Sequence, residues 1–168
     1  MENVWVFFTL LGQPEFWGIL GVILLLTYFV MGHSANPEKK RVFKKALLFF
    51  VISVSISVLI TQGLKYTFSH ERPCIVCSPG DVECNYYCLD SPSFPSGHSA
   101  LTFAGFTSLF FVLKRKRRML PIFILPALTA LSRVMLGVHF WQDIIVGSLI
   151  GISIPVIVHQ LKDKWWDF

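Results

Sequence analysis

The order of apolar and polar stretches along the chain predicts a bundle of membrane helices. A spanning helix needs about 20 predominantly apolar residues, and flanking Lys and Arg side chains can help a shorter run. Five runs reach or approach this length: Phe16–Met31, Ala46–Leu64, Ser99–Leu113, Met119–Val138 and Phe140–His159. The expected fold class is therefore all-α, a polytopic membrane helical bundle with five clear spans.

One further apolar stretch, Val4–Leu11, is too short to span a bilayer. Gly12, Gln13 and Pro14 follow it, and this combination should break a helix at that point. We expect Val4–Leu11 to form either an interfacial helix or one half of a broken span.

The composition agrees with a membrane protein. Hydrophobic residues make up 54% of the 168 residues and charged residues 15%, which is too apolar for a soluble domain of this length. We expect one integral membrane domain over residues 1–168, with no signal peptide. The net charge of +5 would suggest nucleic-acid binding in a soluble protein. Here it reflects the loop bias that orients membrane helices, so no nucleic-acid partner is expected.

Three basic clusters predict how the chain lies in a cell membrane. They are residues 39–45, the run Lys114–Arg118, and Lys162 with Lys164. Cytoplasmic loops carry an excess of Lys and Arg, and two spans separate the first two clusters, so both clusters and the C-terminus should be cytoplasmic. The connection at about 66–94 would then lie on the extracytoplasmic side.

That connection contains all four cysteines of the chain: Cys74, Cys77, Cys84 and Cys88. Disulfides are the expected state of cysteines on this side of a membrane, and four cysteines allow three connectivities. Zinc held by four thiolates is the alternative. The gap of six residues between the middle two cysteines is short for common zinc sites, which favours disulfides.

Three cations stand apart from the basic clusters, namely Lys65, Arg72 and Arg133. Isolated ionisable residues at a membrane edge need a partner of opposite charge, which makes them functional candidates. Lys65 and Arg72 are seven residues apart, close to two helical turns, and would share a face if the second span continued past Leu64. Ordinary interfacial side chains are the alternative reading of this pair.

A second group of candidates, Pro95-Ser96-Gly97-His98, opens the third apolar run. Ser96 is a good N-cap, and Gly97 would let a ligand approach the backbone. The free N–H groups of a helix N-terminus bind anions, and His98 would stand beside such an anion. A capped helix start with an interfacial histidine is the alternative.

A third group lies at the last junction between apolar runs and contains Ser132-Arg133, His139 and Asp143. His139 and Asp143 are four residues apart and would face the same way on a helix. A carboxylate bonded to one imidazole nitrogen fixes the tautomer and leaves the other nitrogen free to attack. Arg133 could hold phosphate oxygens with two donors. An Arg133–Asp143 ion pair that merely ties two helices together is the alternative, and it leaves His139 unexplained.

Together these groups suit phosphoryl transfer. Cations and backbone N–H groups would neutralise a phosphoryl group, one histidine would attack phosphorus, and the other would protonate the leaving oxygen. The sequence offers no acidic cluster suited to Mg²⁺, so neither a metal nor another cofactor is expected.

The motifs Lys65-x6-Arg72-Pro73, Pro95-Ser96-Gly97-His98 and Ser132-Arg133-x5-His139-x3-Asp143 resemble the signature of the type 2 phosphatidic acid phosphatase superfamily. The resemblance implies that His139 is a nucleophile forming a phosphohistidine, that Asp143 orients it, and that His98 is the general acid. It also implies phosphate binding by Lys65, Arg72, Ser96, Gly97 and Arg133. The family usually has six spans and needs no metal, and the cysteine-rich insertion is not a general feature of it.

The expected function is metal-independent hydrolysis of a lipid phosphate or diphosphate at the extracytoplasmic face. Polyprenyl diphosphate, phosphatidylglycerophosphate and phosphatidic acid are the expected substrate types, and the bilayer is the other partner. One alternative is a non-hydrolytic anion transporter or channel, which would not need two histidines and an aspartate. A haloperoxidase-like activity is a further alternative, which the many apolar runs disfavour.

Overall fold

The computed structural model describes residues 2–34, 36–76, 88, 91–113 and 117–165. Within these ranges the chain is helical and has no strand. The helices are α1 Glu2–Leu10, α2 Pro14–Ser34, α3 Pro37–Phe68, α4 Pro73–Val76, α5 Gly97–Val112, the 3₁₀ helix η1 Arg117–Phe123, α6 Ile124–Met135 and α7 Trp141–Trp165.

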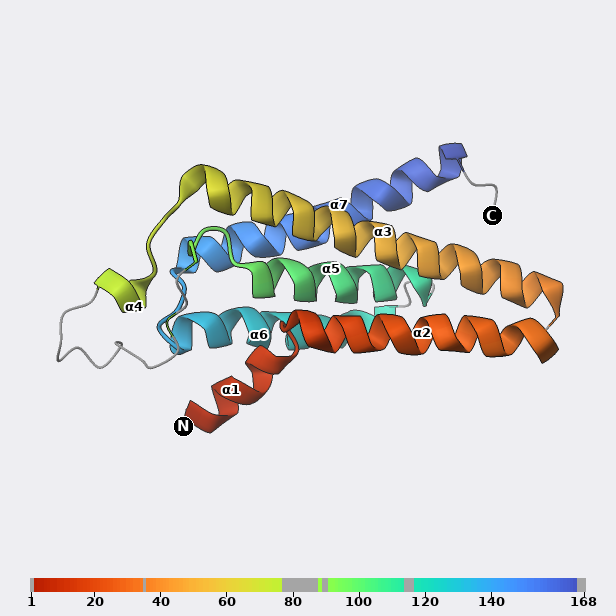
Figure 1. The fold of residues 1–168 in the computed structure, drawn as a ribbon, viewed down its shortest axis with the longest axis horizontal. Helices are drawn as coiled ribbons and strands as arrows, with labels where there is room; N and C mark the ends of the chain where they lie inside the picture. The colour runs from red at the N-terminus through yellow and green to blue at the C-terminus, as the bar shows by residue number, and fades with distance from the viewer. Residues whose placement is uncertain (1, 35, 77–87, 89–90, 114–116, 166–168) are drawn as a thin grey trace.

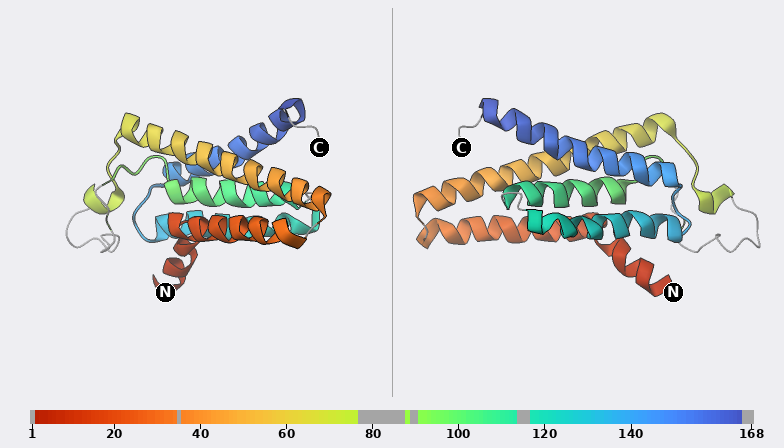
Figure 2. Two further views of the ribbon diagram at one scale, coloured as in Figure 1. Left: turned by 45° about the vertical axis from the view of Figure 1, so that its right-hand side comes forward. Right: turned by 180° about the vertical axis from the view of Figure 1, so that it is seen from behind.

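Helix α5 is the centre of the bundle (Figure 1). It packs against α3, α6 and α7, while α2 packs on α3 and α1 packs on α6. Most of the α5 residues from Ser99 to Ser108 are buried. Both views in Figure 2 show α1 leaning away from the axis of α2.

The prediction of five clear spans is not confirmed. Among the described residues, three segments are long and apolar enough to cross a membrane: Pro37–Val76, Arg117–Met135 and Trp141–Leu161. A fourth is possible if the broken pair Val4–Leu10 and Pro14–Val30, which bends by 44°, counts as one span. Helix α5 is apolar but shorter, because it begins at Gly97 and its last helical residue is Val112.

Helix α3 is longer than its apolar run, because capping rather than hydropathy sets its ends. Asn36 accepts a hydrogen bond from the Glu38 N–H at 2.9 Å, and Pro37 occupies the first turn, both of which favour a helix start. The last helical residue is Phe68, and Ser69 takes a left-handed conformation with φ of 45°. The predicted loop at about 66–94 thus begins later than expected and contains the short helix α4.

Helices α5 and α7 cross at close range through glycines of α7. A Cβ atom on Gly147 would lie 2.4 Å from the Ser96 carbonyl oxygen, and one on Gly151 would lie 2.4 Å from the Ala100 carbonyl oxygen. Real Cβ atoms do not approach that closely, so the crossing requires glycine at both positions. Small residues spaced by four commonly allow such contact between membrane helices.

Cys74 and Cys88 form a disulfide with a Cα–Cα separation of 5.8 Å. This bond joins the first and last of the four cysteines, which is one of the pairings the sequence left open. Sulfurs in a disulfide are not thiolate ligands, so these two are not available for the zinc alternative. Cys77 and Cys84 lie outside the described residues.

Candidate active site

The end of α6 brings Arg133 and His139 together. Gly137, with φ of 66°, donates its N–H to the Val134 carbonyl at 2.9 Å. The Val138 and His139 N–H groups both donate to the Arg133 carbonyl, at 3.1 and 3.2 Å. The Gly137 and Val138 bonds make the Schellman arrangement, in which glycine supplies the left-handed residue after a helix. The chain therefore turns sharply, and Arg133 and His139, which five residues separate in the sequence, are in direct backbone contact.

Asp143 holds the His139 imidazole and the start of α7 at once. Its Oδ2 lies 3.2 Å from His139 Nδ1 and accepts the Phe140 N–H at 2.9 Å. The second bond caps the helix, because the third helical residue reaches back to the N-cap backbone. A carboxylate at Nδ1 places the imidazole proton there, so Nε2 carries the free electron pair.

His139 is 3% exposed and Asp143 is fully buried. Burial lowers the pKa of His139 to about 4. The hydrogen bond to Asp143 acts in the opposite direction, and the positive charges of Arg133 and Arg72 lower this pKa further. The imidazole is therefore neutral at pH 7, which is the state that a nitrogen nucleophile requires.

The segment Pro95–His98 is joined directly to α7. The Ser96 N–H donates to the Asp143 carbonyl at 3.0 Å, and Gly147 lies against the Ser96 carbonyl. The Ser96 hydroxyl caps α5 by accepting the Ser99 N–H at 3.4 Å, and it is also 3.0 Å from the Ser99 hydroxyl. Ser96 is fully buried, so the structure places it as a helix cap, and its phosphate-binding role stays a prediction.

Lys65 continues a stripe of small polar residues along the buried face of α3. The stripe runs at every fourth position: Ser53, Ser57, Thr61 and Lys65 are all buried. The Ser57 and Thr61 hydroxyls donate to carbonyls one turn back, at 2.8 and 2.7 Å, so these two polar groups are satisfied within the helix. The Lys65 ammonium then donates to the Pro92 carbonyl.

Arg72 reaches the same place from outside α3. Helix α3 does continue past Leu64, but it ends at Phe68, before Arg72. The two cations therefore do not share a helical face, and that expectation is corrected. The Arg72 guanidinium donates to the Ser91 carbonyl at 2.7 Å, the Ser91 hydroxyl at 2.9 Å and the Val138 carbonyl at 3.1 Å. Its Nη1 lies 3.4 Å from His139 Nε2. These bonds direct the guanidinium toward His139 Nε2.

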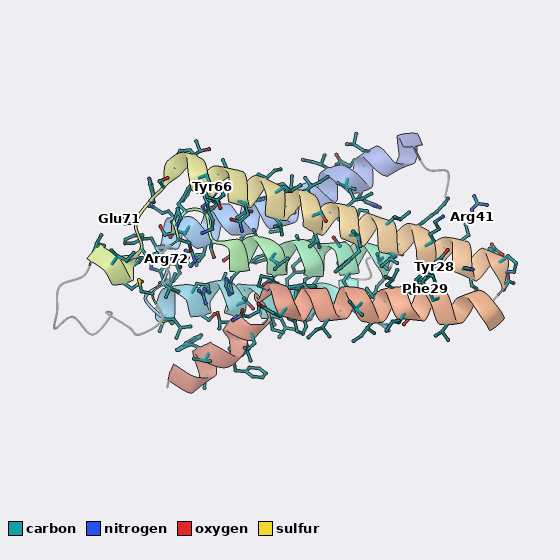
Figure 3. All side chains as sticks on the ribbon, in the orientation of Figure 1. Tyr28, Phe29, Arg41, Tyr66, Glu71 and Arg72 are labelled. Atoms are coloured by element: carbon teal, nitrogen blue, oxygen red, sulfur yellow. A yellow bond between two sulfur atoms is a disulfide. The ribbon has the colours of Figure 1, made fainter. Side chains whose placement is uncertain are left out.

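Lys65, Arg72, Gly97, His98 and His139 line one cavity of about 490 Å³. The three separate sequence groups therefore converge at one end of the bundle, where Figure 3 labels Arg72. Arg133, Ser96 and Asp143 do not line the cavity, although Arg133 and Asp143 hold groups beside it.

The site carries more positive charge than the protein balances. Among the described residues, neither Lys65, Arg72 nor Arg133 has a carboxylate partner; the carboxylate of Asp143 pairs with His139 instead. Three buried polar atoms of the site have no hydrogen-bond partner within the described chain: His98 Nε2, Arg133 Nε and Asp143 Oδ1. Two buried cations, Lys65 and Arg72, line the cavity together with His98, whose Nε2 has no partner in the described chain, and this combination indicates a site for an anion.

Three residues of this region were not assigned to the site from the sequence. Gly137 could have been found, since a glycine two residues before His139 fits the end of a helix. Gly12 was predicted only as part of a helix break, and Thr9 carried no signal. Thr9 accepts a hydrogen bond from Arg133, and Gly12 lies against His98 in the cavity.

The sequence profile of the PAP2 superfamily matches residues 46–167. The chain belongs to the PAP2 superfamily. Lipid phosphate phosphatase 2 of Arabidopsis thaliana is 33% identical over 143 residues, which cover 68% of this chain and 49% of the plant protein. Decaprenylphosphoryl-5-phosphoribose phosphatase of Mycobacterium tuberculosis is 30% identical over 136 residues, which cover 79% of this chain and 68% of that protein.

The PAP2 fold is also seen among solved structures. The crystal structure of a transmembrane PAP2 type phosphatidylglycerolphosphate phosphatase from Bacillus subtilis matches with a TM-score of 0.73 at 23% identity, over 99% of this chain and 79% of that one. This likeness concerns the fold. The chain spans about half the length of the first curated PAP2 relatives it matches.

Proposed function

We propose that this protein is a lipid phosphatase that hydrolyses a phosphate or diphosphate monoester of a membrane lipid through a phosphohistidine on His139. One observation carries the proposal. A neutral imidazole is fixed by Asp143 at Nδ1, and its Nε2 lies in a cavity lined by two cations and a second histidine. This is the arrangement of an activated nucleophile with an orienting carboxylate.

The reaction has two steps. His139 Nε2 attacks phosphorus, the bond from phosphorus to the lipid oxygen breaks, and His98 gives that oxygen a proton. Water then attacks the phosphohistidine, His98 takes a proton from the water, and inorganic phosphate leaves while His139 regains its free electron pair. Asp143 keeps the proton on Nδ1 and balances the charge of the imidazole in both steps.

The cations would stabilise the phosphoryl oxygens during both steps. Lys65 and Arg72 line the cavity, and Arg133 lies behind it with one guanidinium nitrogen unpartnered. Gly97 at the start of α5 offers backbone N–H groups at a helix N-terminus. Preorganised donors of this kind are usually the largest single contribution to such catalysis.

The shape of the cavity supports a lipid substrate. From the polar end it continues between α2 and α3, along an apolar wall that includes Trp17, Val51, Val54, Val58 and Leu101. Fourteen residues separate Val51 from Lys65, so at 1.5 Å per residue the wall extends for about 20 Å. A single apolar chain could lie there with its phosphate at the cations.

The substrate class and the sidedness belong to this proposal. Polyprenyl diphosphate, phosphatidylglycerophosphate and phosphatidic acid all present a phosphate on one or two long apolar chains. The basic cluster at the start of α3, where Figure 3 labels Arg41, lies at the opposite end of the bundle from Arg72. If that cluster is cytoplasmic, the site opens on the extracytoplasmic side. The comparisons give no support to the transporter alternative.

The test is phosphate release by purified protein in detergent with EDTA present, using the three lipid types as a panel. His139→Ala should lower kcat by at least about 10⁴-fold, because loss of a nucleophile removes the pathway. Gln142→Ala is the matched control, since Gln142 is an exposed neighbour on α7 and should keep wild-type activity. Activity in His139→Ala equal to that of the control would refute the assignment.

A trapping experiment tests the intermediate itself. Protein quenched during turnover of a ³²P-labelled substrate should carry an acid-labile, alkali-stable label. His139→Ala should carry none, whereas His98→Asn should accumulate label from an aryl phosphate, because its leaving group needs no proton but the second step still needs a base. An equal label in wild type and His139→Ala would place the phosphoryl group elsewhere.

A further inference from the structure

The break between α1 and α2 reaches into the active-site region, although it lies outside the matched residues 46–167. We propose that residues 9–12 are a positioning element of the active site, with Thr9 setting the guanidinium of Arg133 and Gly12 setting the imidazole of His98. The inference rests on the proposed function and assigns it residues that neither the motifs nor the family match covers.

Thr9 provides the first contact. Its side chain is buried, and its Oγ1 accepts a hydrogen bond from Arg133 Nη1. Within the described chain, the bond to Thr9 is the side-chain hydrogen bond seen for this guanidinium. Arg133 Nε has no partner, and no carboxylate lies within ion-pair distance of Arg133. A guanidinium is a rigid planar fork, so a hydrogen bond at one nitrogen constrains the direction of its remaining donors. Thr9 therefore determines where those donors point.

Gly12 provides the second contact. A Cβ atom at this position would lie 2.7 Å from both Cβ and Cδ2 of His98 and 3.0 Å from Cγ. Among the described glycines, only Gly137 has a positive φ, so the backbone conformation of Gly12 does not itself require glycine. Glycine is required at position 12 because any side chain there would occupy the space of the His98 imidazole. Because His98 Nε2 has no hydrogen-bond partner in the described chain, packing against Gly12 is what locates the ring.

The break itself is held from three helices. The Leu11 carbonyl accepts a hydrogen bond from Trp17 Nε1 at 2.7 Å. It also lies 3.3 Å from Thr102 Oγ1, whose single proton is shared with the His98 carbonyl at 2.7 Å. Thr129 Oγ1 lies 3.1 Å from both the Phe8 and the Leu125 carbonyls and donates to one of them at a time. These contacts place the break against α2, α5 and α6. A segment fixed on three sides can position the groups it contacts.

The Thr9 arm of the test uses Thr9→Val and Thr9→Ser. Thr9→Val should lower kcat/KM about tenfold for both n-hexyl phosphate and p-nitrophenyl phosphate, because Arg133 would act on the phosphoryl group in each and loses a charge-assisted hydrogen bond. Inhibition by vanadate, which mimics the transition state, should weaken by a similar factor. Thr9→Ser keeps the hydroxyl and should restore both. Thr27→Val is the control, since Thr27 is an exposed threonine on α2 whose hydroxyl bonds the Ile23 carbonyl.

The test of Gly12 compares kcat/KM for two substrates whose leaving groups differ in their need for a proton. Gly12→Ala should lower kcat/KM for n-hexyl phosphate by about 100-fold, since displacing a general acid by about 1 Å can cost that much. The fall for p-nitrophenyl phosphate should be within about fivefold, because p-nitrophenolate leaves without a proton. Gly63→Ala is the control, since nothing lies within 4 Å of a Cβ at Gly63 and it does not line the cavity.

The outcomes separate this inference from the proposed function. If wild-type protein releases phosphate from neither of these substrates nor from the lipid panel, both the proposed function and this inference are wrong. Active wild type with unchanged Thr9→Val and Gly12→Ala would overturn the inference alone. Equal losses on both substrates in Gly12→Ala, or a Thr9→Ser variant as impaired as Thr9→Val, would also overturn it, because general damage to the fold predicts those results.

Discussion

The glycines of α7 and of α2 serve opposite purposes. In α7, Gly147 and Gly151 face carbonyl oxygens of α5 at distances that leave no room for a side chain. In α2, Gly18 and Gly21 line the cavity, and nothing lies within 4 Å of where their Cβ atoms would be. One pair of glycines closes a helix crossing and the other pair keeps a space open.

This difference divides the molecule into two regions. The tight region, made by α5, α6 and α7, holds Arg133, His139 and Asp143 close together through short backbone contacts. The open region, between α2 and α3, has an apolar wall, and α2 also exposes many large apolar side chains to its surroundings. Rigidity thus coincides with the proposed chemistry, and space coincides with the proposed lipid chain.

After His139→Ala, the largest expected effect of a single change is at the carboxylate of Asp143 in the tight region. Asp143→Asn should lower kcat about 10³- to 10⁴-fold, because an amide can favour the wrong tautomer of His139. Phosphate release and thermal stability in detergent are the measurements. A loss of activity that merely follows unfolding at the assay temperature would assign Asp143 a structural role as the cap of α7.

The helix crossing should be the next most sensitive feature. Gly147→Ala places a methyl group against the Ser96 carbonyl, and overpacking of this kind costs about 3 kcal/mol. Thermal unfolding in detergent should occur at lower temperature, with a parallel loss of activity as Ser96–His98 moves. Gly63→Ala gives the same chemical change in open space and should not destabilise the protein. Equal stability of the two variants would contradict the tight crossing.

The open region should respond in substrate selectivity. Gly18→Leu combined with Gly21→Leu should fill part of the cavity and lower kcat/KM for a long-chain lipid phosphate about tenfold, since a site 1–3 kcal/mol less favourable discriminates by that order. Hydrolysis of n-hexyl phosphate should stay near the wild-type value, and Gly63→Leu should change neither. A uniform loss on both substrates would show that these glycines support folding instead of leaving space.

The smallest effect should appear in the pH dependence of stability. The pKa of His139 is lowered to about 4 from its ordinary value of 6.5, so the unfolded chain binds more protons between these values. Stability from this group is fully present above about pH 6.5 and is lost as pH falls toward 4. His139→Asn should reduce the slope of thermal stability against pH in that window. Equal slopes in the two proteins would mean that His139 is not buried in its neutral form beside Asp143, Arg72 and Arg133.

The candidate residues could be identified from the sequence because charged side chains are costly in a membrane. Lys65, Arg72, Arg133 and Asp143 stand in or beside apolar runs, and such residues need a reason to be there. Their spacing to His98 and His139 predicted one site, and the cavity contains both histidines. The lengths of the helices were less well predicted, because the cap at Asn36 and the left-handed Ser69 set the ends of α3 independently of hydropathy.

Two features could not have been predicted from local pattern. Thr9 and Gly12 contact Arg133 and His98, which lie more than 80 residues away along the chain, and the helix break predicted at Gly12 gives no sign of these contacts. The pairing of Cys74 with Cys88 was one of three possibilities, and the choice depends on how α4 and the chain before α5 approach each other.

The sequence by itself determined which residues are available for chemistry and that they belong in a membrane, because hydropathy and isolated charge are properties of the chain. The tertiary structure decided which of those residues touch, which helices pack closely and which leave space. Those features depend on the distances between segments that are remote in sequence. Glycines such as Gly147 and Gly12 permit close approach, but what they approach is decided only when the helices pack together.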